Sequence, residues 1–523
     1  MLNPETLETI LRECLPDVAY WRNINIQDAK KYGAPDGSSR KSKRPRPYSN
    51  YVALLCDIID AELSCYEEVV EKKVWKDAMI EEYQSIMKND VWDVVLRQEG
   101  KSMVTSKWIY KTKHTADGSV EKHKARFTAC GFSQKEGIDY EEIFAHVARY
   151  TSIRAILVIA AVMKWKLHQM DVKTTFLNGV VEEEVYVEQP QGFDTHDKQT
   201  HVCRLKKALY GLKWAPKTWY GRIDSFMMCL GFTNSKEDPS LYYKVADGGP
   251  VILLLYVDDL FLTGDKKLIV GCKRELTAKF EMKDLGPLHS FLGLEVWQKS
   301  DENFLSQGKY VVKILKRFRM MDCKSMPTPM VTNLKLLSDT SSETVDATMY
   351  RQIIGLLMYL TNTRPYICFA VNTLSQYMVE SRRVHLIAAK HVMRYLKGTV
   401  DYGLRYVSDH EIRLQGNVDS NWANSVTDRK STIGSCFSLG SAMILWLSKK
   451  QTSVALSTTE VEYIAACSAS SEVVWLRKLL ARLFDLELEV KCIFCDNQIC
   501  IKLSENPVFH DKSKHIEIKY HYC

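Results

Sequence analysis

The sequence has no apolar run long enough to cross a membrane. Its longest, from Ala155 to Met163, falls well short of the roughly 20 residues that a spanning helix needs. The N-terminal segment MLNPETLETILREC has acidic residues where a signal peptide has basic and then apolar ones, so we expect a protein that is not secreted. The 15 cysteines show no framework spacing, which favours a reducing compartment over a disulfide scaffold.

The length and composition are those of a globular protein. At roughly 100–200 residues per domain, a chain of 523 residues has room for about three domains. Hydrophobic residues make up 46% and charged residues 26%, which excludes a disordered or collagen-like chain. The 71 Lys and Arg residues exceed the 64 Asp and Glu residues, giving a net charge of +7. This charge is compatible with a polyanionic partner but too small to identify one.

Local patterns divide the chain into four regions. Residues 1–74 predict a poorly packed leader, in which the basic segment 38–50 is either a nuclear-localisation or nucleic-acid-contacting arm or a solvated linker. The elements predicted next, in chain order, are a helix at 75–88, a hairpin at 106–132 around Asp117-Gly118, a helix at 152–164, a strand ending at Asp171, a helix opening at Ala215-Pro216 and a buried strand at 251–257. Residues 322–350 predict the interdomain boundary, 350–398 predict helices, and residues from 412 predict a separate α/β domain.

Acidic residues at two strand ends form the first candidate site. Asp171 closes an apolar stretch, and Asp258 and Asp259 lie at the tip of a tight apolar hairpin. Adjacent buried carboxylates raise each other's pKa unless a cation neutralises them. Oxygen ligands suit Mg²⁺, and two such ions about 4 Å apart can activate a hydroxyl nucleophile and stabilise a leaving pyrophosphate. The alternative is that Asp258-Asp259 is merely a hairpin turn.

A second metal signal lies near the C-terminus. Cys492, Cys495, His510 and His515 fit the C-x₂-C…H-x₄-H spacing of a zinc site. Against zinc, Cys492 lies on a strand whose alternating pattern predicts a core position for its side chain. A zinc-dependent binding module is therefore the weaker alternative for this region.

Twelve ordered motifs stand between residues 75 and 523: SKWIYKTK, KHKARFTACGFSQKEGIDYEEIF, QMDVKTTFLNG, LYGLKWAPKTWY, YVDD, FLGLEV, TRPYICFAV, RYLKGT, STIGSCFSL, KKQTSVALSTTEVEYIA, CDNQ and KHIEI. In this order they resemble the reverse transcriptase–ribonuclease H part of a copia-type LTR retrotransposon Pol polyprotein. The resemblance implies an α+β right-hand polymerase with palm, fingers and thumb at 75–321, a linker and connection segment at 322–411, and an α/β ribonuclease H-like domain at 412–523. In the family that domain continues to a further acidic residue, so we expect it to be C-terminally truncated here.

The resemblance also assigns roles in the polymerase. Asp171, Asp258 and Asp259 match its metal-binding carboxylates. The other matched positions are Arg126 and Lys113 as contacts of the incoming triphosphate, Phe176 as the aromatic gate that excludes a 2′-OH, and Leu292-Gly293 as the primer grip. Arg suits phosphate because its planar fork holds two oxygens. For the lysine contact, the spacing of the motif does not choose between Lys113 and Lys111. The plain alternatives are a core Phe, solvated hairpin lysines and a buried hairpin.

The C-terminal domain carries a second set of acids. Asp419, Glu462 and Asp496 follow the order strand-Asp, helix-Glu, strand-Asp and match the metal ligands of ribonuclease H. Glu460 competes with Glu462 for this role. Ser457 can cap the helix and Glu460, three residues later, completes a capping box, which leaves Glu462 for the metals.

The implied function is an RNA-directed DNA polymerase with a ribonuclease H that uses two Mg²⁺ per active site, or Mn²⁺ instead. Implied partners are RNA and DNA template-primers, dNTPs and the other Pol and Gag products of the element, with no membrane. The implied location is cytoplasmic, in a virus-like particle, and nuclear. Six positions depart from the family pattern: His146, Thr175, Trp214, Tyr366, Asn421 and Val461. None removes a proposed metal ligand, but Trp214 brings a bulky ring to the template region, so a decayed relic that keeps the fold and binds nucleic acid is the alternative.

Overall fold

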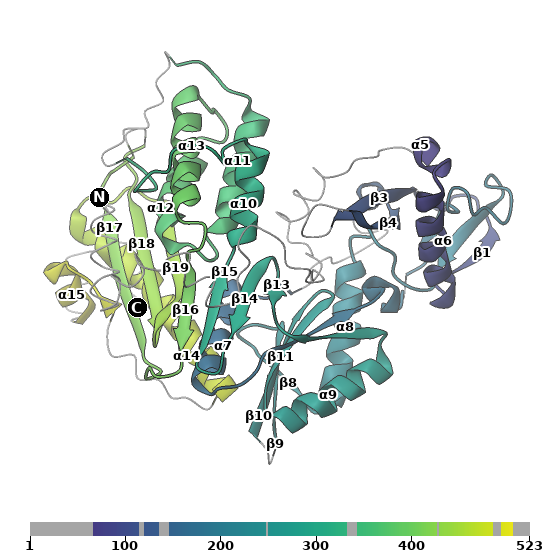
Figure 1. The fold of residues 1–523 in the computed structure, drawn as a ribbon, viewed down its shortest axis with the longest axis horizontal. Coiled ribbons are helices and arrows are strands. Elements are labelled where there is room, and N and C mark those ends of the chain that lie inside the picture. Colours follow the sequence, from purple (N-terminus) through teal and green to yellow (C-terminus); the bar gives the residue numbers. More distant parts are fainter. Residues whose placement is uncertain are drawn as a thin grey trace. The chain divides into compact units, whose positions relative to one another are not determined.

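The computed structural model describes residues 66–114, 120–134, 146–181, 183–246, 249–331, 342–425, 428–484 and 493–505. Within them the chain forms two compact units (Figure 1). The described residues of the first unit lie within 66–148 and 167–288, and those of the second within 149–166 and 289–505. The basic segment 38–50 and the first 65 residues of the predicted leader lie outside the described residues.

The first unit begins with helices and short strands. α5 (Tyr66–Val70) lies inside the predicted leader yet buries Val69, so packing starts earlier than the sequence predicts, because so short a helix shows no hydrophobic period. The predicted helix at 75–88 is confirmed as α6 (Lys73–Lys88), which buries Trp75, Met79 and Ile86. The other elements of this region are β1 (Trp92–Leu96), β2 (Met103–Val104), β3 (Ser106–His114), β4 (Val120–Ala129), η1 (Gly131–Ser133), β6 (Tyr186–Val187) and β7 (His201–Leu205). β3 and β4 form the predicted hairpin, whose Asp117-Gly118 turn lies outside the described residues.

A six-stranded sheet is the centre of the first unit, with the order β12-β5-β11-β10-β9-β8. Its elements are β5 (His168–Val172), η2 (Thr175–Asn178), α8 (Ala215–Cys229), β8 (Thr233–Asn234), β9 (Leu241–Ala246), β10 (Gly249–Tyr256), β11 (Asp259–Gly264), α9 (Lys266–Lys279) and β12 (Met282–Pro287). The predicted strand ending near Asp171 and the predicted buried hairpin are confirmed as β5 and β10–β11. α8 and α9 share one apolar cluster with the strands and so cover one face of the sheet (Figure 1).

The second unit contains a small antiparallel sheet, helices and a C-terminal α/β region. Its first elements are α7 (Tyr150–Val162), β13 (Ser290–Phe291), β14 (Leu294–Gln298), β15 (Glu302–Ser306), α10 (Gly308–Arg317), α11 (Ala347–Leu360), η3 (Pro365–Ile367), α12 (Cys368–Ser375), α13 (Arg383–Gly398) and β16 (Gly403–Val407). The sheet has the order β13-β14-β15-β16. The helices predicted at 350–398 are therefore confirmed.

The C-terminal region contains both strands and helices, as the α/β prediction from residue 412 requires, in the order strand, hairpin, helix, strand and helix. Its elements are β17 (Leu414–Asn421), β18 (Thr432–Leu439), β19 (Ala442–Lys450), α14 (Thr458–Phe484), β20 (Ile493–Phe494) and α15 (Gln498–Glu505). The sheet has the order β19-β18-β17-β20, and β20 is parallel to β17. The long helix α14 packs against β17 and β18. This arrangement places strand ends and one helix beside each other, which is what a shared site needs.

The division of the chain differs from the predicted boundary within 322–350 in two respects. β15 pairs with β16, so one sheet spans that boundary. α7, predicted as part of the polymerase region, belongs to the second unit, where the Arg154 guanidinium lies 4.1 Å from the Trp446 ring centre. The Asn303 side chain donates to the Leu157 carbonyl at 2.9 Å. The reason is that α7 is buried on nearly every face, and its periodicity does not say which elements cover it. Within the described residues, no helix combines the length and the hydropathy that a membrane span requires.

Candidate active sites

The β10–β11 hairpin brings the first three acids together. Tyr256 pairs with Asp259, so Val257 and Asp258 form a two-residue turn. Val257 has a φ of +53°, an uncommon conformation for a β-branched residue. Across the sheet Asp259 is the register partner of Asp171 on β5, and the Val172 amide donates to the Asp258 carbonyl at 2.8 Å. The predicted convergence of these acids is therefore confirmed, while their roles stay a prediction.

Burial makes this cluster electrostatically costly. Burial, and next the charge of Asp171, raise the pKa of Asp258 to about 7, although Lys124 and Arg126 lower it. Burial and Asp258 raise the pKa of Asp259 well above its ordinary value, against a hydrogen bond from Gln169 Nε2 to Oδ1 at 3.0 Å. Asp258 Oδ1 is buried and has no hydrogen-bond partner within the described part of the chain. A bound cation would relieve each of these costs.

Arg126 lies on β4 and is held by two contacts. Its Nη1 donates to both carboxylate oxygens of the buried Glu82, at 3.3 and 3.1 Å. Its guanidinium lies 4.1 Å from the centre of the Tyr210 ring. Arg126 and Lys124 both act on the charge of Asp258, so the hairpin presents basic groups toward the acids. Lys113 and Lys111 pair in register with Lys122 and Lys124; of the Lys113 side chain nothing is described.

Phe176 follows Asp171 in the short helix η2. Its half-buried ring packs against both apolar clusters of the first unit and meets Tyr210 edge to face at 5.1 Å. Tyr210 therefore contacts both Arg126 and Phe176. This position fits the predicted gate beside the acids, but the packing also fits a core residue, so the role stays a prediction.

Leu292 and Gly293 belong to the second unit. They form the turn between β13 and β14, with φ values of +51° and +74°. The Tyr359 hydroxyl donates to the Leu292 carbonyl, and a side chain at Gly293 would collide with that hydroxyl. The predicted tight hairpin is therefore present, and its role as a primer grip stays a prediction.

The second acidic cluster lies in the C-terminal region. β17 and β20 run parallel with Asn417 opposite Phe494, so Asp419 lies two residues further along β17 and Asp496 lies two residues after Phe494, just beyond the end of β20. Glu462 reaches them from α14. Ser420 connects two of the acids: its amide donates to Asp419 Oδ1 at 2.6 Å and its hydroxyl donates to Glu462 Oε1 at 2.7 Å. The structure therefore gathers the three predicted acids.

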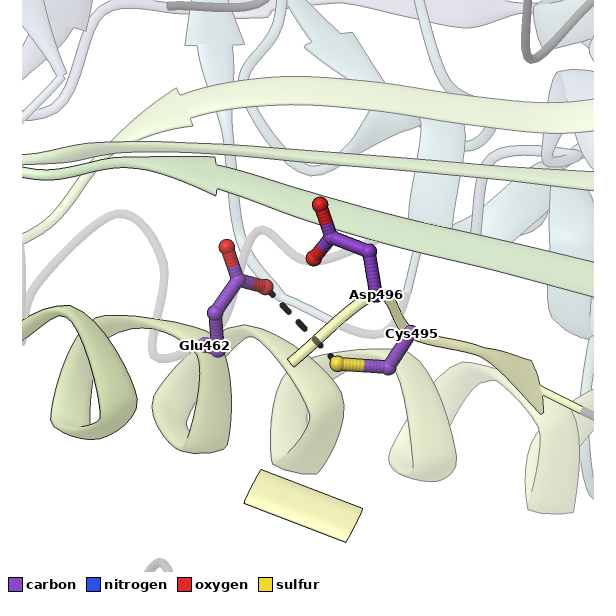
Figure 2. Close-up of side chains that lie close together, drawn as sticks. All are labelled: Glu462, Cys495 and Asp496. Atoms are coloured by element: carbon purple, nitrogen blue, oxygen red, sulfur yellow. Dashed lines mark hydrogen bonds between the residues drawn. The ribbon is translucent and has the colours of Figure 1, made fainter. Parts of the chain in front are cut away.

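Burial and repulsion between the acids raise pKa values in this cluster as well. Burial raises the pKa of Asp419, and the charge of Asp496 adds to the effect. Burial, and after it the charges of Asp419, Cys495 and Asp496, raise the pKa of Glu462 to about 8, although the Ser420 hydrogen bond lowers it. Glu462 Oε2, Cys495 Sγ and an oxygen of Asp496 lie within 4.8 Å of one another (Figure 2).

Glu460 has the structural role that the sequence predicts. Its amide donates to Ser457 Oγ at 3.2 Å, and its Oε2 accepts from the Leu456 amide at 2.7 Å. In a standard capping box the second bond would come from the Ser457 amide, one residue later. The helix start thus occupies Glu460 and leaves Glu462 for the cluster.

Sequence reasoning missed several residues that support the two sites. They are Glu82, Gln169, Tyr210 and Ser420. Two of them had a signal: Gln169 lies two residues before Asp171 on the same face of β5, and Ser420 directly follows Asp419. Glu82 and Tyr210 come from distant segments, and no local spacing connects them with Arg126.

Residues 89–332 match the family described as Reverse transcriptase (RNA-dependent DNA polymerase). The Pol polyprotein of transposon TNT 1-94 from Nicotiana tabacum is 40% identical, over 92% of this chain and 38% of that protein. That of transposon RE1 from Arabidopsis thaliana is 37% identical, over 93% of this chain and 33% of that protein. A transposon Ty5-1 protein from Saccharomyces cerevisiae is 35% identical, over 58% of this chain and 100% of that protein.

These matches and the fold define the class as a reverse transcriptase with a mixed α/β fold. More particularly, the chain belongs to the copia-type retrotransposon Pol polyprotein family. It spans only 38% and 33% of the length of the first two Pol relatives. A solved foamy viral protease–reverse transcriptase in complex with double-stranded DNA is 10% identical, with a TM-score of 0.42, over 76% of this chain and 60% of that one. A similarity this weak supports no further conclusion.

Proposed function

We propose that this chain is an RNA-directed DNA polymerase that extends a primer on RNA and DNA templates. The observation that carries the proposal is the convergence of Asp171 with the buried Asp258 and Asp259, in which one Asp258 oxygen has no partner in the described residues. Membership of the reverse transcriptase family supports the same activity. The substrates are dNTPs and a template-primer.

The donor atoms of this cluster fit Mg²⁺, with Mn²⁺ as a substitute. They are carboxylate oxygens, which hard divalent cations prefer, and burial and mutual repulsion raise the pKa values of Asp258 and Asp259, a cost that a bound cation would lower. Asp171, Asp258 and Asp259 would hold two ions. When bound, such ions activate a primer hydroxyl and neutralise a leaving pyrophosphate.

The side chains around the acids bind and orient the nucleotide. Arg126 donates hydrogen bonds to the triphosphate, and the plane of its guanidinium is set by Glu82 and Tyr210. Phe176 occupies the space beside the sugar and disfavours a 2′-OH. Gln169 fixes the orientation of the Asp259 carboxylate through its hydrogen bond.

A second activity, hydrolysis of the RNA strand of a hybrid, is proposed for the C-terminal cluster. Asp419, Glu462 and Asp496 offer the same hard oxygen donors, and Ser420 aligns two of them. Basic side chains and backbone amides hold the nucleic acid mostly by its phosphates. Other Pol and Gag products in a cytoplasmic virus-like particle, and a nuclear phase, complete the proposal by resemblance to the family.

Primer extension tests the proposed function. The full chain is incubated with an RNA template, a DNA primer and dNTPs, with and without Mg²⁺, beside the Asp258→Asn variant. Extension that requires Mg²⁺ and Asp258 is expected. If a folded wild-type protein binds the template-primer but never extends it, the relic that keeps only nucleic-acid binding is the correct description.

A further inference from the structure

A thiol lies among the acids of the C-terminal cluster. Cys495 Sγ is 4.0 Å from Glu462 Oε2, and both lie within 4.8 Å of an oxygen of Asp496. Figure 2 shows Glu462 extending from α14 and Cys495 and Asp496 extending from the segment after β20, with the three side chains directed toward one another. The group mixes one sulfur with two carboxylates.

The position of this thiol is fixed by the start of α15. The Asn497 side chain caps the helix by accepting from the amides of Ile499 at 3.1 Å and Cys500 at 2.9 Å. The buried Cys500 side chain hydrogen-bonds Cys495 and packs with Tyr463 of α14. Cys495 is thus held against α14 by packing and by a second thiol, so it is not an isolated surface cysteine.

The chemistry of the group differs from that of the acids alone. Mg²⁺ takes oxygen ligands, so a thiol adds nothing to a magnesium site. A thiolate beside carboxylates selects a softer ion such as Zn²⁺. Zn²⁺ binds Cys sulfur at about 2.3 Å and carboxylate oxygen at about 2.0–2.2 Å in tetrahedral sites, so the observed separations need to shrink by only about 1 Å.

We propose that Zn²⁺ binds Glu462, Cys495 and Asp496, beside the Cys500 thiol that hydrogen-bonds Cys495, and that it thereby competes with Mg²⁺ for the two carboxylates. The competition rests on the proposed nuclease function, whereas zinc binding does not. The site differs from the spacing-based zinc prediction, which shares only Cys495. The other three residues of that prediction, Cys492, His510 and His515, lie outside the described residues.

Direct metal binding tests the site. The full-length protein is titrated with Zn²⁺ by calorimetry and with Cd²⁺ by its thiolate-to-metal absorption band, without Mg²⁺. Cys495→Ser should weaken the tightest zinc site by at least about 10-fold, the range seen when even an outer ligand partner is lost, and should reduce the band. The matched control is Cys229→Ser, which changes an exposed cysteine of the first unit and should alter neither.

The decisive comparison is between the two serine variants, each checked for an unchanged melting curve. Equal zinc affinity in the wild type and Cys495→Ser, or no binding at all, overturns the site. A retained melting curve with lost affinity only in Cys495→Ser supports it. Glu462→Gln provides a second route, because it should weaken zinc binding while keeping every thiol.

Competition is then measured as hybrid cleavage in Mg²⁺ with increasing Zn²⁺. Zinc should inhibit wild-type cleavage at concentrations that leave Cys495→Ser active. If zinc binds through Cys495 but no Mg²⁺ concentration gives cleavage, the nuclease proposal fails and the zinc site stands. If both proteins cleave and are inhibited alike, the proposed competition is wrong.

Discussion

Asp171 and Asp259 are register partners on the neighbouring antiparallel strands β5 and β11. The turn of the β10–β11 hairpin adds the buried Asp258 beside them, so the half-buried Asp171 and two buried acids meet at the same end of these neighbouring strands. Burial and mutual repulsion both disfavour the charged forms of these carboxylates. Ionising them in the folded protein therefore costs free energy, and a bound divalent cation removes that cost. The geometry of the backbone, rather than any long-range side-chain contact, creates the proposed metal site.

Replacing Asp258 should abolish DNA synthesis. Asp258→Asn removes one charged metal ligand but keeps the shape of the side chain. Metal stabilisation of the transition state is worth several kcal/mol, so primer extension should fall by at least about 100-fold. Asp284→Asn is the matched control, since this acid of β12 in the same sheet is half-exposed and paired with Lys273. Equal activity of the wild type and Asp258→Asn would remove Asp258 from the mechanism.

The metal-free first unit should lose stability as pH rises from about 4 to about 7. The pKa of Asp258 is raised from its ordinary value of 3.8 to about 7, so in this window the folded state binds more protons than the unfolded state. Stability is therefore greatest below the unfolded value and declines as pH rises through the window. Asp258→Asn should flatten this decline, and Mg²⁺ should reverse it above pH 7. Thermal unfolding across this pH range with a chelator, repeated with Mg²⁺, measures both effects. Identical pH profiles for the wild type and Asp258→Asn would contradict the prediction.

Truncating Phe176 should relax sugar selection. Phe176→Ala opens the space beside Asp171, so ribonucleotide incorporation should rise relative to deoxynucleotide incorporation. The half-buried ring should cost less on truncation than the roughly 3–5 kcal/mol of a fully buried Phe. Phe176→Tyr keeps the ring and should keep the selection. Unchanged discrimination in a folded Phe176→Ala protein would leave Phe176 as a packing residue only.

Local sequence patterns were sufficient for the strand-end acids and for most elements. Apolar runs that end in acids located β5 and the β10–β11 hairpin, because a buried strand and its turn are both short-range features. The choice of Glu462 over Glu460 also came from local physics, since a capping residue is defined by its spacing from Ser457.

Features that depend on tertiary packing could not be predicted. The sequence did not show that the Trp214 ring packs in the core at the start of α8, where it is 4% exposed. The contact of Tyr210 with Arg126 and Phe176 joins three distant segments. The place of α7 in the second unit depends on which elements cover a helix that is buried on nearly every face, and hydrophobic periodicity does not contain that information.

Arg126 should determine dNTP affinity through its planar fork. Arg126→Lys keeps the charge opposite Glu82 but loses bidentate hydrogen bonding, so KM for dNTP should rise by about 10-fold, the value of one charged hydrogen bond of about 1.5 kcal/mol. Lys122→Ala is the control, because Lys122 lies on the same strand in an exposed pair with Glu81. Steady-state kinetics measure the effect, and an equal change of KM in both variants would show that the effect is not specific to the planar fork of Arg126.

Glu460 and Glu462, two residues apart on α14, should respond to substitution in opposite ways. Glu462→Gln removes a charge whose pKa is raised from 4.5 to about 8, so the metal-free protein should become more stable between these pH values, while cleavage of hybrid RNA is lost. Glu460→Ala removes the acceptor of the Leu456 amide, so it should cost about 1 kcal/mol of stability and leave cleavage intact. Primer extension should persist in both variants, because its acids lie in the other unit. Thermal unfolding, hybrid cleavage and primer extension, all measured on the same preparation of each variant, check this prediction. If hybrid cleavage survived Glu462→Gln but not Glu460→Ala, Glu460 would be the metal ligand and Glu462 would not.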